Sequence, residues 1–502
     1  MSLLWIASLL ISLATGALLA ALLLPIRKRG GGEIALTLFA GGGIGIGVSS
    51  CVHFLCLTAG VAAFAWAADL ALFLLLSFLC IRRFRKELLG VPLSLLPKQP
   101  FSGFQILLAS LLTVEIVAST ASFLVAYLKE PHGKWDAWLI WNMHARFLFR
   151  AGEEWRAAFA SGLDWSHWDY PLLLPLAIVR AWRYAGDENA LVPAVMGFLF
   201  SALLVGLLLC SLSLLRSRAQ GFLAAMLLLG TPFFITMGAS QFADIPLAFF
   251  ILATFVMIAL QGRLPEGSSG PLVLAGVAAG LCAWTKNEGL LFLPIAVASL
   301  FGAALYSGGW RPAVKRTGHF LLGALPVLLI VLCFKLRLAP ANDLVAGFGP
   351  AAAAAKLLDW GRYAEIARSF FFSGISFTQG LIDVRKGMHL NPGAVSILLP
   401  AVYLPLAGIR IDAKDRTALI QVGGILLAMT AGYFFVYVLT PLDLTYHLMT
   451  SLNRLFLQLW PGALFLFFMA AATPEGEPTM EEAKTTTADG TRLKTTKGRK
   501  RL

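Results

Sequence analysis

Apolar segments separated by shorter polar links run along most of the chain. About thirteen of these segments are long enough, at roughly 20 residues, to cross a bilayer as a helix. The segments are unbroken and show no period of two, which favours helices over the strands of a membrane barrel. We predict membrane helices at residues 3–25, 34–58, 60–81, 104–128, 190–215, 219–237, 244–261, 270–285, 288–307, 318–338, 393–411, 417–439 and 455–471.

The composition is that of a membrane protein. Hydrophobic residues make up 58% of the 502 residues and charged residues only 13%, against about 25% charged residues in soluble domains. All six cysteines lie inside apolar segments without a CxxC pair, which is typical of buried small side chains rather than a metal or redox site. The predicted fold class is an all-α polytopic membrane protein.

Basic residues gather in alternate links. RKRG follows the first predicted helix, RRFRKE the third, RSR the fifth, RPAVKR the ninth and RIDAKDR the eleventh. Short Lys- and Arg-rich loops stay in the cytoplasm, so an outside N-terminus places all five loops inside. The net charge of +13 then reflects membrane orientation and anionic lipids, and we expect no nucleic-acid partner.

This orientation divides the chain into three regions. We expect a three-helix membrane region at 1–103, a catalytic membrane region at 104–471 and a disordered basic cytoplasmic tail at 472–502. Two long polar loops, 129–189 and 339–392, fall outside the cytoplasm. Each contains a stretch with the spacing of an amphipathic helix that lies along the membrane surface.

The first outer loop carries candidate chemistry at both ends. Its start, KWDAWLIW, places Asp136 among Trp135 and Trp138, and its end, HWDYPLLLPL, carries Asp169 and Tyr170. Tryptophan anchors a surface helix at headgroup level, and its ring can also stack on a sugar. The simpler alternatives are an acid favoured by a helix dipole at Asp136 and an N-cap at Asp169.

Three later outer links add more charged residues. GASQFADIPLAFF carries Asp244, AWTKNEGLLFLP carries Lys286 and Glu288, and LTYHLMTSLNRLF carries His447 and Arg454. The last two are seven residues apart and share a helix face. A helix cap, a self-satisfying Lys–Glu pair and a snorkelling arginine are the simpler alternatives.

Taken together, these residues place carboxylates and positively charged side chains on one face of the membrane. A carboxylate suits removal of a proton from an alcohol. Lysine and arginine suit a phosphate that develops charge as a leaving group. The combination predicts sugar transfer from a lipid-phosphate carrier.

The ordered set of motifs resembles the GT-C superfamily of membrane glycosyltransferases. It is most similar to the bacterial branch related to protein O-mannosyltransferases (glycosyltransferase family 39) and the lipid A aminoarabinose transferase. The resemblance rests on KWDAWLIW, HWDYPLLLPL, SQFADIPLAFF, AWTKNEGLLFLP and SLNRLFLQLWP, in that order, and covers roughly residues 104–471. It implies a GT-C fold and inverting transfer from a polyprenyl-phosphate sugar outside the cytoplasmic membrane.

The resemblance also implies roles for individual residues. Asp136 matches the family's general base, and Asp244 the second acid, which supports the acceptor or the loop geometry. Lys286 and Arg454 match basic groups near the donor phosphate. HWDYPLL departs from the family's HPPL-like segment and leaves the role of Asp169 open. The catalytic loop here follows the fourth helix rather than the first, so three N-terminal helices are an addition.

Two other function classes compete with this interpretation. A transporter or flippase would line its path with charges, but the chain shows no repeated halves. A ligase that joins glycans from a lipid diphosphate would also use outer basic residues. We expect no metal cofactor, because lysine and arginine can neutralise a monophosphate. The expected partners are the lipid-linked donor, membrane lipids and a lipid, glycan or protein acceptor.

Overall fold

The structure is a computed structural model, and it describes residues 3–24, 30–88, 100–160, 166–265, 267–342, 349–377 and 395–474. The described chain is helical, with one isolated β-bridge between Ile409 and Ala471. The predicted all-α polytopic class is confirmed. Most of the basic RKRG link and of the predicted disordered tail lies outside the described residues.

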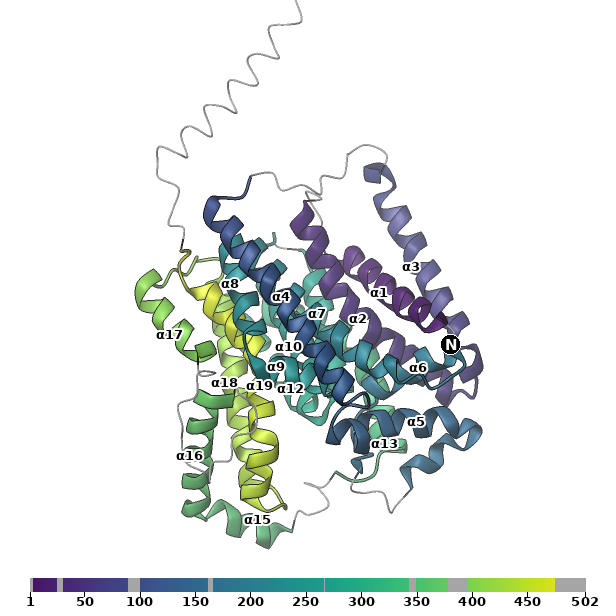
Figure 1. The fold of residues 1–502 in the computed structure, drawn as a ribbon. Helices are drawn as coiled ribbons and strands as arrows, with labels where there is room; N and C mark the ends of the chain where they lie inside the picture. The colour runs from purple at the N-terminus through teal and green to yellow at the C-terminus, as the bar shows by residue number, and fades with distance from the viewer. Residues whose placement is uncertain are drawn as a thin grey trace, which may run out of the picture.

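Helices occupy all thirteen predicted membrane segments (Figure 1). They are α1 (Leu4–Leu23), α2 (Gly31–Thr58), α3 (Ala65–Leu88), α4 (Gly103–Lys129), α7 (Leu191–Leu215), α8 (Arg218–Leu229), α9 (Pro232–Ala239), α10 (Asp244–Gly262), α11 (Gly270–Thr285), α12 (Asn287–Gly308), α13 (Trp310–Arg337), α17 (Val395–Ala407), α18 (Arg416–Leu439) and α19 (Leu444–Ala470).

Not every one of these helices is a full span. Within the described residues, 10 helices are long and apolar enough to cross a membrane, and α11 and α17 are shorter. The predicted helix 219–237 is two helices, α8 and α9, bent by 65° at their junction. Pro232 begins α9, and a proline disfavours helical backbone in the residue before it, which explains the break.

Shorter helices form the two outer loops. In the first loop these are a π-helical turn (Ala137–Trp141), α5 (Asn142–Arg150), a 3₁₀ helix η3 (Gly152–Phe159) and α6 (Leu173–Ala185). The second loop contains α15 (Pro350–Leu357) and α16 (Trp360–Ser376); in Figure 1, α16 runs beside the lower part of α19 and α15 lies below it. Amphipathic helices were predicted in both loops.

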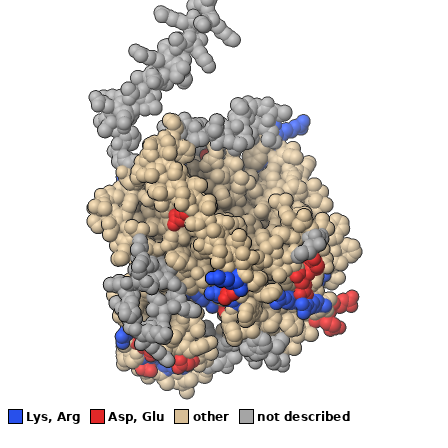
Figure 2. Space-filling view, viewed as in Figure 1, with Lys and Arg blue, Asp and Glu red and all other residues tan. Residues whose placement is uncertain are grey.

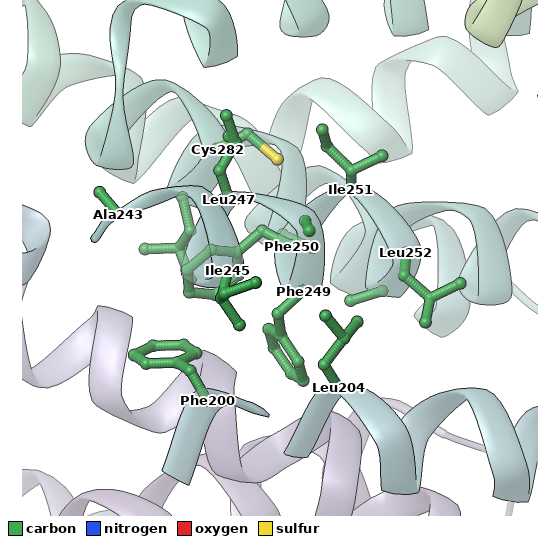
Figure 3. Close-up of a cluster of buried hydrophobic side chains, with 14 of the residues drawn as sticks. Phe200, Leu204, Ala243, Ile245, Leu247, Phe249, Phe250, Ile251, Leu252 and Cys282 are labelled. Carbon is green, nitrogen blue, oxygen red and sulfur yellow. The ribbon is translucent and has the colours of Figure 1, made fainter. Parts of the chain in front are cut away.

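Helix α10 forms the centre of the core. Every residue from Asp244 to Ala259 is buried, as expected for a helix that is apolar on all sides. Figure 3 shows Phe249 and Phe250 of α10 near Phe200 and Leu204 of α7, with Cys282 of α11 close by. This central position carries the first residue of α10, Asp244, into the interior.

The N-terminal helices are part of the same body. In α2, the hydroxyl of Ser50 donates to Leu173 O at 2.9 Å and accepts from Trp284 Nε1 at 3.2 Å. Helix α2 thus joins α6 and α11. Helix α1 approaches α2 closely, because a Cβ on Gly45 would lie only 1.9 Å from Ser12 O; such glycines let backbones meet.

Basic links and the candidate site residues lie at opposite ends of the helices. Arg216 donates to Arg410 O at 3.0 Å and to Ala471 O at 2.8 Å, and Arg263 binds Asp415. The candidate site residues lie near the other ends of α10, α18 and α19. Figure 2 shows charged side chains gathered in the lower part of the view, below a broad and almost uncharged surface.

Candidate functional site

A fully buried carboxylate, Asp244, is the deepest element of the site. It accepts from Lys286 Nζ at 3.1 Å, Gln458 Nε2 at 2.6 Å and Arg454 Nη2 at 2.9 Å. A charge in the interior persists only when it is paired and hydrogen-bonded. Helices α10, α11 and α19 therefore meet at one ionised group.

Arg454 links this buried acid to a second one at the surface of the protein. Its Nη2 atom lies 2.7 Å from Asp136 Oδ2 and 2.9 Å from Asp244 Oδ2. Its guanidinium carbon lies 4.9 Å from the centre of the Phe242 ring. The Asp136 side chain is 18% exposed, against 0% for Asp244, so the arginine connects an accessible carboxylate to an inaccessible one.

Glu288 completes what we call the central charge cluster: Asp136, Asp244, Lys286, Glu288 and Arg454. Its Oε1 atom lies 2.7 Å from Lys286 Nζ. Three acids and two cations give the cluster a formal charge of −1. The structure brings together these five predicted residues from four separate segments of the chain.

A clamp between two loops fixes the spacing of Asp136 and Asp244. Gln241 adopts the left-handed region at φ 62°, which is uncommon for a residue with a side chain. Its amide accepts from Asn142 Nδ2 at 2.7 Å and donates to Pro131 O at 3.0 Å. The clamp ties the loop before α10 to the loop before Asp136.

A second polar group lies around Asp169, which is buried. Its carboxylate accepts from Asn287 Nδ2 and Asn342 Nδ2, both at 2.7 Å. Lys335 Nζ donates to Asn287 Oδ1 at 2.8 Å and also to the Asp169 carbonyl. Because Asn287 separates Lys286 from Glu288 in the sequence, the two polar groups adjoin each other.

Lys335 and Asn342 were not predicted as site residues. A signal for Lys335 was present, because it ends a predicted membrane helix on the outer side, where basic residues are rare. The same signal identified Arg454. Asn342 lies in a polar link with nothing in the sequence to distinguish it.

Tyr170 lies in a stack of aromatic rings. Its ring centre is 5.6 Å from that of Trp141 and 5.1 Å from that of His167, both nearly parallel. Burial, together with the nearby charges of Glu288 and Asp169, raises the pKa of Tyr170 well above its ordinary value. The phenol is therefore neutral and available as a hydrogen-bond donor at physiological pH.

The three tryptophans of the first loop separate into two environments. Trp135 and Trp138 are 67% and 51% exposed, whereas Trp141 is fully buried. The backbone here is a π-helical turn that precedes α5 rather than one continuous α-helix. The wider turn sends Trp141 into the core and leaves the other two rings at the surface.

His447 does not reach the central charge cluster. Its Nδ1 atom lies 2.9 Å from Thr440 Oγ1, and its ring centre is 4.8 Å from that of Tyr437. Arg362 of α16 donates to the nearby carbonyls of Tyr437 and Val438. His447 thus belongs to the link between α18 and α19, next to the second outer loop.

Among the residues that the structure describes, no three His, Cys, Asp or Glu side chains are grouped so that they could hold a metal ion. The two acids closest to a candidate reaction centre, Asp136 and Asp244, share Arg454 instead. The guanidinium occupies the position between the carboxylates that a cation would take.

Comparison with known proteins identifies related sequences over part of the chain. Residues 170–334 match a family model described as "Dolichyl-phosphate-mannose-protein mannosyltransferase". The predicted resemblance to these glycosyltransferases is confirmed within that region. It includes Tyr170, Asp244, Lys286 and Glu288, whereas Asp136 and Arg454 lie outside it.

A solved structure is also similar. The crystal structure of ArnT from Cupriavidus metallidurans bound to undecaprenyl phosphate shares 14% sequence identity with this chain, with a TM-score of 0.42. The match covers 70% of this chain and 59% of that one. No curated protein sequence matches the chain.

Proposed function

We propose that the protein is an inverting glycosyltransferase of the cytoplasmic membrane. It moves a sugar from a polyprenyl-phosphate donor to an acceptor hydroxyl on the extracytoplasmic side. The family match over residues 170–334 supports sugar transfer. The observation that carries the proposal is the contact of a partly exposed acid, Asp136, with an arginine that a buried acid holds in place.

The exposed edge of the site contains both kinds of group that this reaction needs. The side chains of Asp136, Glu288, Arg454 and Lys335 are between 15% and 21% exposed, whereas Lys286 is only 4% exposed. We therefore assign contact with substrate to the edge groups. Lys286 and Asp244 are positioning residues that hold Arg454 and Glu288.

The reaction proceeds in one displacement. Asp136 takes the proton of the acceptor hydroxyl as its oxygen forms a bond to the anomeric carbon. The bond from that carbon to the donor phosphate breaks, and the phosphate leaves with the electron pair. Arg454 and Lys335 stabilise its charge. Attack opposite the leaving group inverts the anomeric configuration.

Aromatic and polar residues around the edge select and orient the sugar. The exposed Trp135 and Trp138 offer apolar faces at the depth of the lipid headgroups. Neutral Tyr170, beside Asp169, can donate a hydrogen bond to a sugar oxygen. His447, near the second outer loop, is assigned to acceptor binding.

The first experiment is a transfer assay in membranes that contain native acceptors. Labelled polyprenyl-phosphate sugars are given to the wild type and to Asp136→Asn, which removes the base but keeps size. We expect about 10²- to 10⁴-fold slower transfer in the variant, the usual contribution of a general base. Glu153→Gln, at an exposed acid of η3, is the matched control and should transfer sugar normally.

Other results of the transfer assay would lead to a different general base or a different function. Equal turnover by Asp136→Asn would contradict the base assignment, and Glu288→Gln would then test the other edge acid. If neither protein transfers sugar but the wild type moves labelled lipid across a bilayer, the protein is a transporter. Preference for an oligosaccharide diphosphate over a monosaccharide phosphate in a competition assay would identify a ligase.

We also expect transfer without a divalent metal. The cations of this site are Arg454, Lys335 and Lys286, and Arg454 already lies between Asp136 and Asp244. Activity of protein purified with EDTA should therefore equal that of protein supplied with Mg²⁺ or Mn²⁺. Loss of transfer in EDTA with recovery on adding metal would contradict this expectation.

A further inference from the structure

A mostly apolar cavity with a few polar side chains lies between α1, α2, α3 and α6. Its volume is about 270 Å³, and its polar lining comes from His53 of α2 and Arg180, Arg183 and Tyr184 of α6, with Trp66 of α3 beside them. We call it the N-terminal cavity. Helix α6 leads away from the central charge cluster, so Arg183 lies roughly 20 Å along the chain from Tyr170, at 1.5 Å per helical residue.

One guanidinium in this cavity, that of Arg180, is held by an ion pair and a hydrogen bond but keeps one nitrogen without a hydrogen-bond partner. Arg180 is 2% exposed. Its Nε atom donates to Asp69 Oδ2 at 2.6 Å and its Nη1 atom to Ser8 O at 2.8 Å. Its guanidinium carbon lies 5.1 Å from the centre of the Tyr184 ring, and its buried Nη2 atom has no hydrogen-bond partner among the described residues. The ion pair thus orients the guanidinium and leaves the N–H groups of Nη2 available to a further hydrogen-bond acceptor.

Two further side chains of the cavity, His53 and Arg183, also have buried nitrogen atoms without hydrogen-bond partners. His53 is 1% exposed, and neither of its ring nitrogens has a hydrogen-bond partner in the described chain. The buried Nε atom of Arg183 also has none there. Buried polar atoms are normally satisfied, and leaving them without partners costs stability. Three such residues around one cavity indicate that it takes a polar occupant.

The charge of the cavity indicates the sign of that occupant. Arg180 and Arg183 contribute two positive charges, and Asp69 is the acid paired with Arg180. The sum is one uncompensated positive charge in apolar surroundings. Arginine binds phosphate through parallel N–H donors, so an anionic oxygen group fits the free donor atoms.

The rim indicates where the occupant comes from. Leu4 and Trp66, which line the cavity, are 58% and 52% exposed, and Phe64, next to the lining residues in the chain, is 65% exposed. An aromatic and apolar rim around a basic cavity suits a molecule with a charged head and an apolar tail. We propose that the N-terminal cavity binds the phosphate of an anionic lipid.

The test is lipid binding to the full-length protein, measured by native mass spectrometry from detergent. The probes are phosphatidic acid, phosphatidylcholine and inorganic phosphate. We expect phosphatidic acid to bind best, and Arg183→Gln to weaken it about tenfold, the effect of one charged hydrogen bond. Arg150→Gln, an exposed arginine of α5 that pairs with Glu188, is the matched control and should bind as the wild type does.

Thermal unfolding without added lipid shows whether the variants are folded. If Arg183→Gln folds poorly, His53→Phe replaces it, because that change keeps a ring but removes both nitrogens. Equal binding of phosphatidic acid by all variants would overturn the proposal, because the lipid would then be bound elsewhere. Binding of inorganic phosphate but not of phosphatidic acid would overturn the assignment to a lipid.

Discussion

At the scale of residues, the site depends on which charged groups are buried and which are accessible. Asp244 and Lys286 are enclosed, and they hold Arg454 and Glu288 at the edge. The enclosed groups cannot rearrange without leaving an unpaired charge in the interior, which is strongly destabilising. The edge groups therefore keep their positions when substrate is absent.

His144 gives a prediction for stability against pH. Burial lowers its pKa to about 3, whereas the unfolded chain has a histidine pKa of about 6.5. Between these values the unfolded state binds more protons, so stability is complete above pH 6.5 and falls as the pH decreases. The free energy of unfolding is expected to fall by up to about 1.4 kcal/mol per pH unit. The melting temperature in detergent, recorded against pH, follows this decrease.

Two variants separate this effect from general acid sensitivity. His144→Phe keeps the stacking on Trp168, at 3.7 Å between ring centres, and should flatten the slope between pH 6.5 and 5. His132→Gln, at an exposed histidine, should leave the slope as it is. An unchanged slope in His144→Phe would show that another group controls the acid response.

At the scale of elements, the close contact of α1 with α2 depends on glycine. A Cβ on Gly45 would lie 1.9 Å from Ser12 O, whereas Gly302 of α12 has open space around it. We expect Gly45→Ala to lower the melting temperature, with a cost of about 1–3 kcal/mol from overpacking. Gly302→Ala is the control and should stabilise α12 by up to about 1 kcal/mol. Equal melting temperatures would mean that α1 moves aside freely.

The sequence predicted elements better than their contacts. Apolar runs located a helix at every predicted membrane segment, because lipid leaves the backbone few alternatives. They did not show the bend between α8 and α9, or that α19 begins at Leu444. Polar residues at a helix start, such as Thr445 and His447, interrupt the apolar run without interrupting the helix.

The candidate site was predictable as a set of residues but not as an arrangement. Ionisable residues within membrane segments, and basic residues at their outer ends, are rare, so Asp244, Lys286 and Arg454 were distinctive. Their pairing required knowing which helices are neighbours, and α10 and α19 are far apart in sequence. For that reason, neither the bridge from Arg454 to Asp136 nor the group around Asp169 was predicted.

At the scale of the whole molecule, the two ends of the helix bundle have different chemistry. At one end, the basic residues Arg216 and Arg263 bind carbonyls and an acid that hold the links between helices. The central charge cluster and the helices of the outer loops lie at the other. We expect the cluster end to face away from the cytoplasm, in accordance with the positive-inside rule.

Cysteine labelling in intact cells tests this orientation. The six native cysteines, all in apolar helices, are first replaced by alanine. Leu358→Cys, at a residue that is 77% exposed beside α15, should react with a membrane-impermeant maleimide. Lys414→Cys, at a side chain that is 54% exposed, should react only after the membrane is opened. The reverse pattern would place the site in the cytoplasm.

The contacts of α2 with α6 and α11 have a consequence for synthesis in the cell. Ser50 binds Leu173 and Trp284, which follow it by 123 and 234 residues. At about 5–20 residues per second, the ribosome supplies these partners roughly 6–25 and 12–47 seconds later. Until Leu173 is made, the contacts available to α2 are the glycine-lined contact with α1 and the contact with α3. The N-terminal helices of the nascent chain must therefore stay together in the bilayer until α6 and α11, the later neighbours of α2, enter it.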